Sequence, residues 1–132
     1  MSNAIAGTGA VLKRGATPIA EVLSITGPGM TRDLIDVTHL GSTGGYREYV
    51  SGYRDGGELT FTINFIFEGY NNMKTDFDSD SSGSYSVILP DAGNTTLTFS
   101  GFVTSMPLSI EPDNAVTVDI TIKITGQVSL SA

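Results

Sequence analysis

Hydrophobic and polar residues alternate along two long segments of the chain, with the period of two that is typical of β-strands. In residues 58–67 one face carries only large apolar side chains: Leu59, Phe61, Ile63, Phe65 and Phe67. In residues 116–124 the corresponding face carries Val116, Val118, Ile120, Ile122 and Ile124. Each segment therefore predicts a strand with one buried and one solvent-facing side.

Shorter segments complete the expected fold. Further strands are favoured at residues 18–25, 32–39, 84–89 and 95–103. The only helical candidate is residues 68–77, because Tyr70, Met73 and Phe77 would form one apolar stripe. We therefore expect a single domain over residues 1–132 that is mostly β, a sandwich or half-barrel of about seven strands with one short helix.

Residues 40–57 join two of the expected strands and are unusual in length and composition. Six of the eighteen residues are glycine, and three tyrosines and two arginines lie among them. Hairpin connections usually have roughly 2–5 residues, so we expect a long loop. A long connection that carries aromatic and arginine side chains is usually a binding element.

We expect this loop to bind protein rather than nucleic acid. Its positive and negative charges nearly cancel, and tyrosine and arginine are favoured at protein interfaces. The expected contact residues are Tyr46, Arg47, Glu48, Tyr49, Tyr53, Arg54 and Asp55. The glycine-containing N-terminal arm, residues 1–15, is also expected to be ordered by contact, either with a neighbouring chain or with its own domain.

Charge and composition exclude several functions. The formal net charge is −7, and residues 33–132 carry four basic and thirteen acidic residues. Because nucleic-acid affinity comes from cations placed at phosphates, we do not expect the chain to grip DNA. It has no cysteine and therefore no disulfide or thiolate chemistry. No run approaches the roughly 18 apolar residues that span a bilayer, so we expect no membrane association.

Candidate catalytic and metal-binding residues are few. His39 is the only histidine, and the spacing suggests neither an orienting acid nor a nucleophile, so we expect it to be structural and the protein not to be an enzyme. Asp76, Asp78 and Asp80 alternate as in a calcium loop, but the glycine and glutamate of that motif are replaced by Ser81 and Val87. A solvated acidic turn is the favoured interpretation, and weak cation binding is the alternative. We expect no cofactor and no metal.

The polar faces of the long strands are rich in threonine and almost free of cations. A β-sandwich usually exposes more lysine and glutamate than this. Such a surface would allow a polyanion to slide past without sticking. The residues expected on it are Glu58, Thr60, Thr62, Thr117, Asp119 and Thr121.

The chain resembles the major tail proteins, or tail tube proteins, of long non-contractile-tailed bacteriophages. The similar segments follow in order over nearly the whole chain: residues 7–13, the strands that flank residues 40–57, residues 57–65, 85–91, 97–106 and 116–126. The resemblance is one of pattern rather than of a diagnostic motif. It implies a structural virion protein that is made in the cytoplasm of a bacterial host and assembled into the phage tail.

The resemblance also implies an assembly. Hexameric rings would stack into a tube, with strands of six subunits joining into a continuous barrel, and double-stranded DNA would pass through the lumen without specific binding. The threonine-rich face would line the lumen, and residues 40–57 with the N-terminal arm would contact neighbouring rings. Tape measure, terminator and baseplate or tip proteins would be partners. Two alternatives stay open: a tube protein of a contractile injection or secretion machine, and a monomeric β-sandwich recognition module such as an adhesin or carbohydrate-binding domain.

Overall fold

The computed structural model describes residue 5 and residues 7–19 and 21–131. Their elements are β1 (Val11–Arg14), β2 (Thr17–Pro18), β3 (Val22–Thr26), β4 (Thr31–Asp36), the 3₁₀ turn η1 (Thr43–Gly45), β5 (Tyr49–Asp55), β6 (Glu58–Asn64), α1 (Phe67–Asp78), β7 (Gly83–Ile88), β8 (Thr96–Ser105), β9 (Leu108–Ser109) and β10 (Thr117–Ser131). The expectation of a mostly β domain with one short helix is confirmed.

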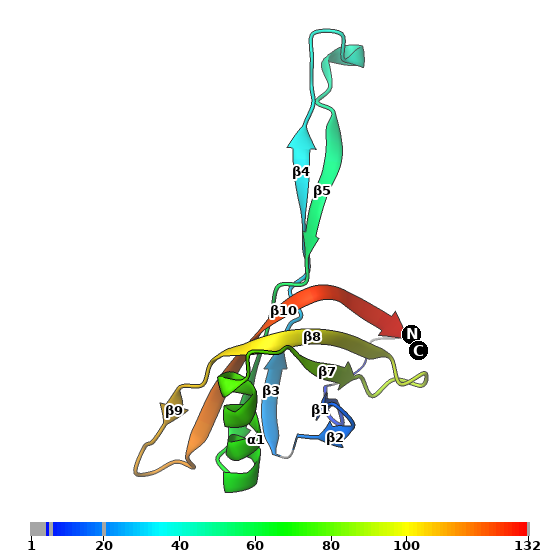
Figure 1. The fold of residues 1–132 in the computed structure, drawn as a ribbon. Helices are drawn as coiled ribbons and strands as arrows, with labels where there is room; N and C mark the ends of the chain where they lie inside the picture. Colours follow the sequence, from blue (N-terminus) through cyan, green and yellow to red (C-terminus); the bar gives the residue numbers. More distant parts are fainter. Residues whose placement is uncertain (1–4, 6, 20, 132) are drawn as a thin grey trace.

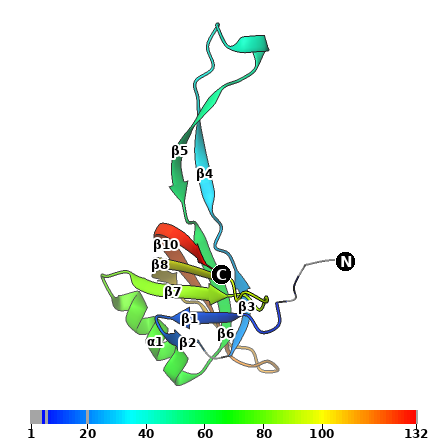
Figure 2. The ribbon, with the colours of Figure 1, turned by 90° about the vertical axis from the view of Figure 1, so that its right-hand side faces the viewer.

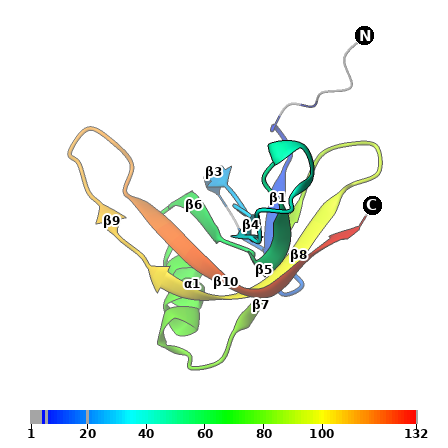
Figure 3. The same ribbon diagram turned by 90° about the horizontal axis from the view of Figure 1, so that it is seen from above.

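One curled antiparallel sheet forms the body of the molecule. Its strand order is β2-β1-β7-β8-β10-β6-β3, and β9 pairs with β10. The 15-residue β10 is its longest strand, and its register against β8 shifts after Thr121 and again after Thr125. Such bulges bend a strand and increase its twist. Seen from above, β8 and β10 curve round one side of the half-barrel, with α1 beside it (Figure 3).

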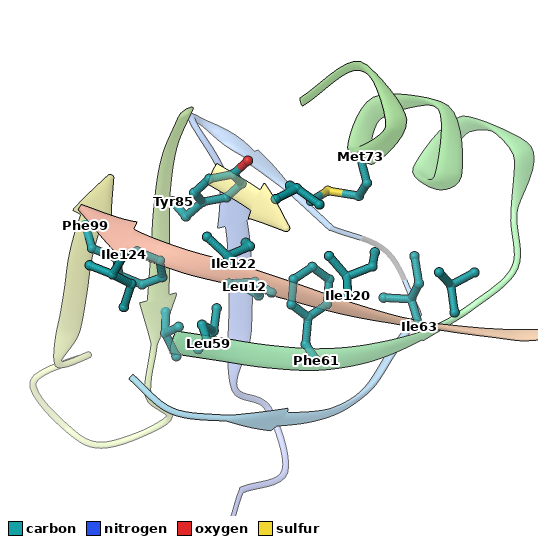
Figure 4. Packing of buried hydrophobic residues seen from close by; sticks show 13 residues of the cluster. Leu12, Leu59, Phe61, Ile63, Met73, Tyr85, Phe99, Ile120, Ile122 and Ile124 are labelled. Atoms are coloured by element: carbon teal, nitrogen blue, oxygen red, sulfur yellow. The ribbon is translucent and has the colours of Figure 1, made fainter. Parts of the chain in front are cut away.

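The core lies inside this curl. The predicted apolar faces of β6 and β10 meet there and pack with residues of β1, β7 and β8 and with Met73 of α1 (Figure 4). The fully buried side chains include Leu12, Leu59, Phe61, Ile63, Ile120 and Ile122. The expected apolar face of residues 58–67 is wrong at its end, because Phe65 and Phe67 are exposed. The strand stops at Asn64, since the chain turns there and begins α1 at Phe67.

The N-terminal arm is partly integrated into its own domain. Val11–Arg14 forms β1, which pairs with β7, and Leu12 is buried in the core. For residues 11–14 the structure agrees with the second of the two alternatives, contact with the chain's own domain. The four residues of β1 are too few to show a period in the sequence. Only their pairing with β7 in the structure identifies them as a strand. Residues 1–4 and 6 lie outside the described part of the chain.

Residues 31–55 form a long hairpin that projects from the body as a two-stranded ribbon (Figures 1 and 2). We call this hairpin the arm. Its strands β4 and β5 pair only with each other, and η1 lies at the tip. The sequence suggested a strand over residues 32–39 followed by a loop over residues 40–57. The strand is present as β4, whereas the loop is corrected, because β5 occupies most of its second half and pairs with β4.

Candidate assembly surfaces

The arm exposes apolar side chains on both of its faces. Ile35 lies directly opposite Val50 in the register, and Leu34 lies opposite Ser51. Leu34 is 64% exposed, Ile35 is 52% exposed, and Leu40 at the tip has no cover at all. A two-stranded hairpin without a third strand or a packed face is only marginally stable in water. The arm therefore exposes apolar surface that its own strand pair does not cover.

Two glycines fix the base of the arm. The chain leaves the body at Gly27 and returns at Gly57, with positive φ angles of 106° and 76°. A Cβ atom at Gly57 would lie 2.2 Å from the carbonyl oxygen of Gly29, and one at Gly27 would lie 2.4 Å from that of Glu58. Only glycine permits both the backbone conformation and this approach of two chain segments. The Gly57 carbonyl also accepts a hydrogen bond of 3.0 Å from the N–H of Ile124, which ties the base to β10.

A hydrogen-bond network shapes the tip of the arm. Asp36 accepts a hydrogen bond of 2.9 Å from the N–H of Thr38, and Arg47 Nη1 lies 3.2 Å from Asp36 Oδ2. The N–H of Glu48 donates to Thr38 Oγ1 at 2.8 Å, and Glu48 Oε2 accepts from Ser42 Oγ at 2.8 Å. Hydrogen bonds from Thr38 hold the pKa of Asp36 below its usual value. Arg47 and Glu48 thus make contacts within the arm, and their contact with another chain stays a prediction.

His39 has neighbours at the tip that the sequence spacing did not suggest. Its Nδ1 lies 3.2 Å from Ser42 Oγ and 3.4 Å from Glu48 Oε2. In a catalytic triad the acid and the nucleophile bind different ring nitrogens of the histidine. Here the serine and the glutamate both contact Nδ1 and also bind each other. The arrangement holds the loop together and is not that of a nucleophile activated by a base.

The remaining expected contact residues lie along the arm. Tyr46 follows η1, Tyr49 begins β5, and Tyr53 is 90% exposed in a bulge opposite Asp33. Four exposed apolar residues of β4 and the tip were not among the expected contact residues: Leu34, Ile35, Val37 and Leu40. Leu34, Ile35 and Val37 belong to the strand expected over residues 32–39. Their exposure could be found only from the pairing of β4 with β5.

The threonine-rich face is a second candidate surface. Cross-strand pairing brings the six expected residues together on the outer side of β6 and β10: Glu58, Thr60, Thr62, Thr117, Asp119 and Thr121. Within it, Thr62 Oγ1 donates a hydrogen bond of 2.6 Å to Asp119 Oδ1.

Lys123 belongs to the same face, as the alternation of residues 116–124 predicts, although it was not among the residues expected to line a channel. It lies opposite Glu58 in the register, and its Nζ is 3.3 Å from Asp55 Oδ1. A hydrogen bond from the N–H of Gly57 and the contact with Lys123 together hold the pKa of Asp55 below its usual value. The one cation that we find on this face is therefore partly neutralised by the base of the arm, and the sequence alternation already pointed to its outward position.

The three aspartates near the end of α1 do not form a cation site. Asp76 accepts hydrogen bonds from Arg14 Nε at 2.7 Å, Arg14 Nη2 at 2.8 Å and Tyr85 OH at 2.6 Å. Asp78 pairs with Lys74 at 2.6 Å. Within the described residues, no three acidic, histidine or cysteine side chains are grouped to hold a metal ion. The cation alternative finds no support in this geometry, because Asp76 already has its partners.

Comparisons with known proteins agree with this architecture. Structures similar to the chain include the tail of an empty gene transfer agent particle with C6 symmetry, at TM-score 0.80 and 21% identity over 98% of this chain and 100% of that one. The sheath/tube terminator of an extracellular contractile injection system has TM-score 0.77 and 17% identity over 99% of each chain. The tube-terminating cap of an anti-feeding prophage has TM-score 0.78 and 16% identity, over 99% of this chain and 93% of that one. At these identities the likeness establishes the fold.

The remaining comparisons concern sequence. No curated protein sequence matches the chain significantly. None of the described helices is long and apolar enough to cross a membrane. The model of the family described as Lambda phage tail tube protein, TTP, matches residues 8–131. Since this match spans nearly the whole chain, the protein belongs to the lambda phage tail tube protein family, and its role is the structural one of building a tail tube.

Proposed function

We propose that six copies of the chain form a ring, that rings stack into the tail tube of a phage virion, and that the DNA genome leaves the particle through this tube. Family membership supports the tube, and the C6 symmetry of the similar gene transfer agent tail supports six copies. Unpaired edges of the body sheet at β2 and β3 favour lateral joining of subunits, because open edges readily pair with further strands. Synthesis in the host cytoplasm belongs to the same proposal.

The arm makes the contact between stacked rings. The observation that carries this assignment is its exposure of Leu34, Ile35, Leu40 and Tyr53 on a ribbon whose strands pair only with each other. Burying such side chains against another copy stabilises the contact by about 25 cal/mol per Å² of apolar surface. The same contact would order a hairpin that is marginal alone. Tyr46, Tyr49 and Tyr53 add the large amphipathic surface that interfaces favour.

The threonine-rich face lines the channel. Its side chains are short and neutral or acidic, and its lysine is held by Asp55. Six chains at −7 each carry a formal charge of about −42, a field that keeps DNA from adhering to the wall. Terminator, baseplate and tape measure proteins would contact the tube at its ends and inside it. The same tube would serve in a contractile injection machine, which the similar terminator chain makes the second candidate.

The experiment replaces residues 31–55 by a Gly-Ser turn. Gly29 and Gly57 are in backbone contact, so a short turn can join the chain there without disturbing the body. Removing residues 42–55 alone would instead leave β4 without its partner. We expect circular dichroism to show a folded β-domain and negative-stain microscopy to show no tubes. Normal tubes from this variant would refute the role of the arm.

A milder variant tests the apolar contact itself. Ile35→Ser with Val50→Ser removes the apolar cross-strand pair of the arm, and we expect it to raise the protein concentration needed for tubes. Phe77→Ser is the matched control, because Phe77 is a similarly exposed apolar residue on α1, away from the arm. If wild-type protein stays a monomer at every concentration and binds glycan, the recognition-module alternative replaces the tube.

A further inference from the structure

Two arginines face each other at the base of the arm. Arg32 of β4 lies directly opposite Arg54 of β5 in the register. Both are exposed, and neither makes an ion pair within the described residues. Like charges directly opposite on a strand pair destabilise it. The pair therefore weakens the arm within one subunit, and an anion from outside the subunit would relieve the repulsion.

A groove lies beside these arginines. It runs between the base of the arm and the second half of β10, with a volume of about 890 Å³. Ile124 and Val128 contribute apolar surface, and Met30 beside the arm and Tyr53 of the arm line it as well. The lining also includes two carboxylates, of which Asp55 is already in contact with Lys123, so that Asp33 alone stands against the two arginines. A groove with apolar surface and this excess of positive charge fits an occupant that combines an apolar side chain with a carboxylate.

The opposite end of the subunit presents that combination. Phe67, the first residue of α1, is 74% exposed, and Glu68 follows it on the exposed first turn. This corner lies at the end of β6 marked by Asn64, whereas the arm joins the other end of β6 at Glu58. The two regions are therefore separated by the length of β6 (Figure 2). Glu21 lies beside Asn64, and Glu111 and Asp113 lie in the loop between β9 and β10, which ends at Thr117, the partner of Asn64 in the register.

These carboxylates have little to neutralise them. Glu21 accepts a hydrogen bond from Asn64, and Glu111 accepts one from Asn114. In the part of the chain that is described, none of the four acids takes part in a salt bridge. One end of the subunit thus carries unpaired acids with an exposed phenylalanine, and the other carries unpaired arginines beside a groove.

We propose that the Phe67–Glu68 corner of one subunit docks into the groove at the base of a second subunit's arm, with Glu68 between Arg32 and Arg54. The contact is head to tail: it joins different ends of identical chains, and repetition of such a contact generates a filament rather than a closed dimer. The proposal rests on the proposed stacking of rings. It adds the receiving surface and the charge pair that set the register of one ring on the next.

The test uses charge reversal in the full-length chain. Arg54→Glu places a carboxylate opposite Arg32, so within one subunit it replaces repulsion by attraction and stabilises the arm. If the pair serves docking, the same change weakens assembly. We expect the critical concentration for tubes, measured by sedimentation and checked by negative-stain microscopy, to rise at least about tenfold. Lys74→Glu, with the same change of charge on α1, is the control and should leave the critical concentration within about twofold of wild type.

The second part of the test is a rescue experiment. Glu68→Arg alone should weaken assembly as Arg54→Glu does, and the two changes together should return the critical concentration to within about threefold of wild type. Assembly of Arg54→Glu at the wild-type concentration overturns the proposal, and so does a double variant no better than the worse single one. Either result leaves the arm's role in stacking intact, since the arm replacement tests that separately. If wild-type chains form no tubes, the proposed function fails and this docking contact fails with it.

Discussion

Asp76 connects three distant parts of the chain, and its replacement by asparagine is the most informative test of the fold. The carboxylate in the last turn of α1 accepts two hydrogen bonds from Arg14 of β1 and one from Tyr85 of β7. Burial raises the pKa of Asp76, but the bonds from Arg14 and Tyr85 outweigh this and hold it below the usual value. Burial likewise raises the pKa of the Tyr85 hydroxyl, which stays a donor.

The size of the effect follows from the acceptor geometry. Asp76 Oδ2 accepts from Arg14 Nε and from Tyr85 OH, while Oδ1 accepts from Arg14 Nη2. An asparagine has one acceptor oxygen. In the better of its two orientations, the asparagine oxygen takes the Oδ2 position and still accepts from Arg14 Nε and Tyr85 OH. Its amide group then takes the Oδ1 position, where two donors, this amide and Arg14 Nη2, face each other. One charge-assisted bond is lost and two are weakened, which costs about 2–3 kcal/mol.

The solvent exposure of the two side chains decides where in this range the free-energy cost lies. The Arg14 side chain is 34% exposed and that of Asp76 is 16% exposed, so solvent screens part of the charge and the cost lies near 2 kcal/mol. For a chain of 132 residues this lowers the melting temperature by about 6–8 °C.

Thermal unfolding followed by circular dichroism below the assembly concentration measures this change. Asp78→Asn is the control, because its pair with Lys74 is an exposed i,i+4 pair worth about 0.3–0.5 kcal/mol. Equal melting temperatures for the Asp76 and Asp78 variants would show that β1 is not held to α1 by this cluster. The reasoning about its acceptors would then be refuted.

Three further predictions concern acidity, the arm and the core. The pKa of Asp76 is lowered in the folded state, so its contribution to stability is present above the ordinary value of 3.8 and is lost as the pH falls through the lowered pKa. Urea midpoints of the wild type should therefore fall more steeply in this acidic range than those of Asp76→Asn. Gly57→Ala should lower the melting temperature more than Gly45→Ala, since both sites have positive φ but only a Cβ at residue 57 meets backbone, at 2.2 Å. Ile122→Ala should cost about 2–5 kcal/mol in urea unfolding and Leu130→Ala less than about 0.5 kcal/mol, because Ile122 is fully buried and Leu130 is 70% exposed.

The body of the fold was readable from the sequence because its strands bury one face. Alternation in β6 and β10 reports that burial directly, and their facing rows of threonines followed from the same period. The paired strands of the arm could not be predicted in this way, because alternation appears only where one face of a strand is buried. Neither face of the arm is buried in its own subunit, and Gly52 and the bulge at Tyr53 interrupt β5, so residues 49–55 carry no strong period.

Contacts between distant residues were also beyond the sequence. Arg14 and Asp76 are 62 positions apart, and nothing in either segment marks them as partners. The acidic turn resembled a cation loop because spacing shows the carboxylates and not their neighbours. Lys123 shows the opposite case: its outward position was predictable, but its neutralisation by Asp55 depends on where the base of the arm meets β10.

The division between body and arm explains how one chain can fold alone and still assemble. The body needs no second chain for its own contacts: its apolar core is buried, and the half-buried carboxylate of Asp76 accepts hydrogen bonds from Arg14 and Tyr85. The arm does the reverse: it exposes Leu34, Ile35 and Leu40 and sets Arg32 against Arg54. Under the proposed stacking a second copy supplies the missing cover, so that ordering of the arm and stacking of subunits are one event. Stability of the tube then depends on protein concentration, while stability of the body does not.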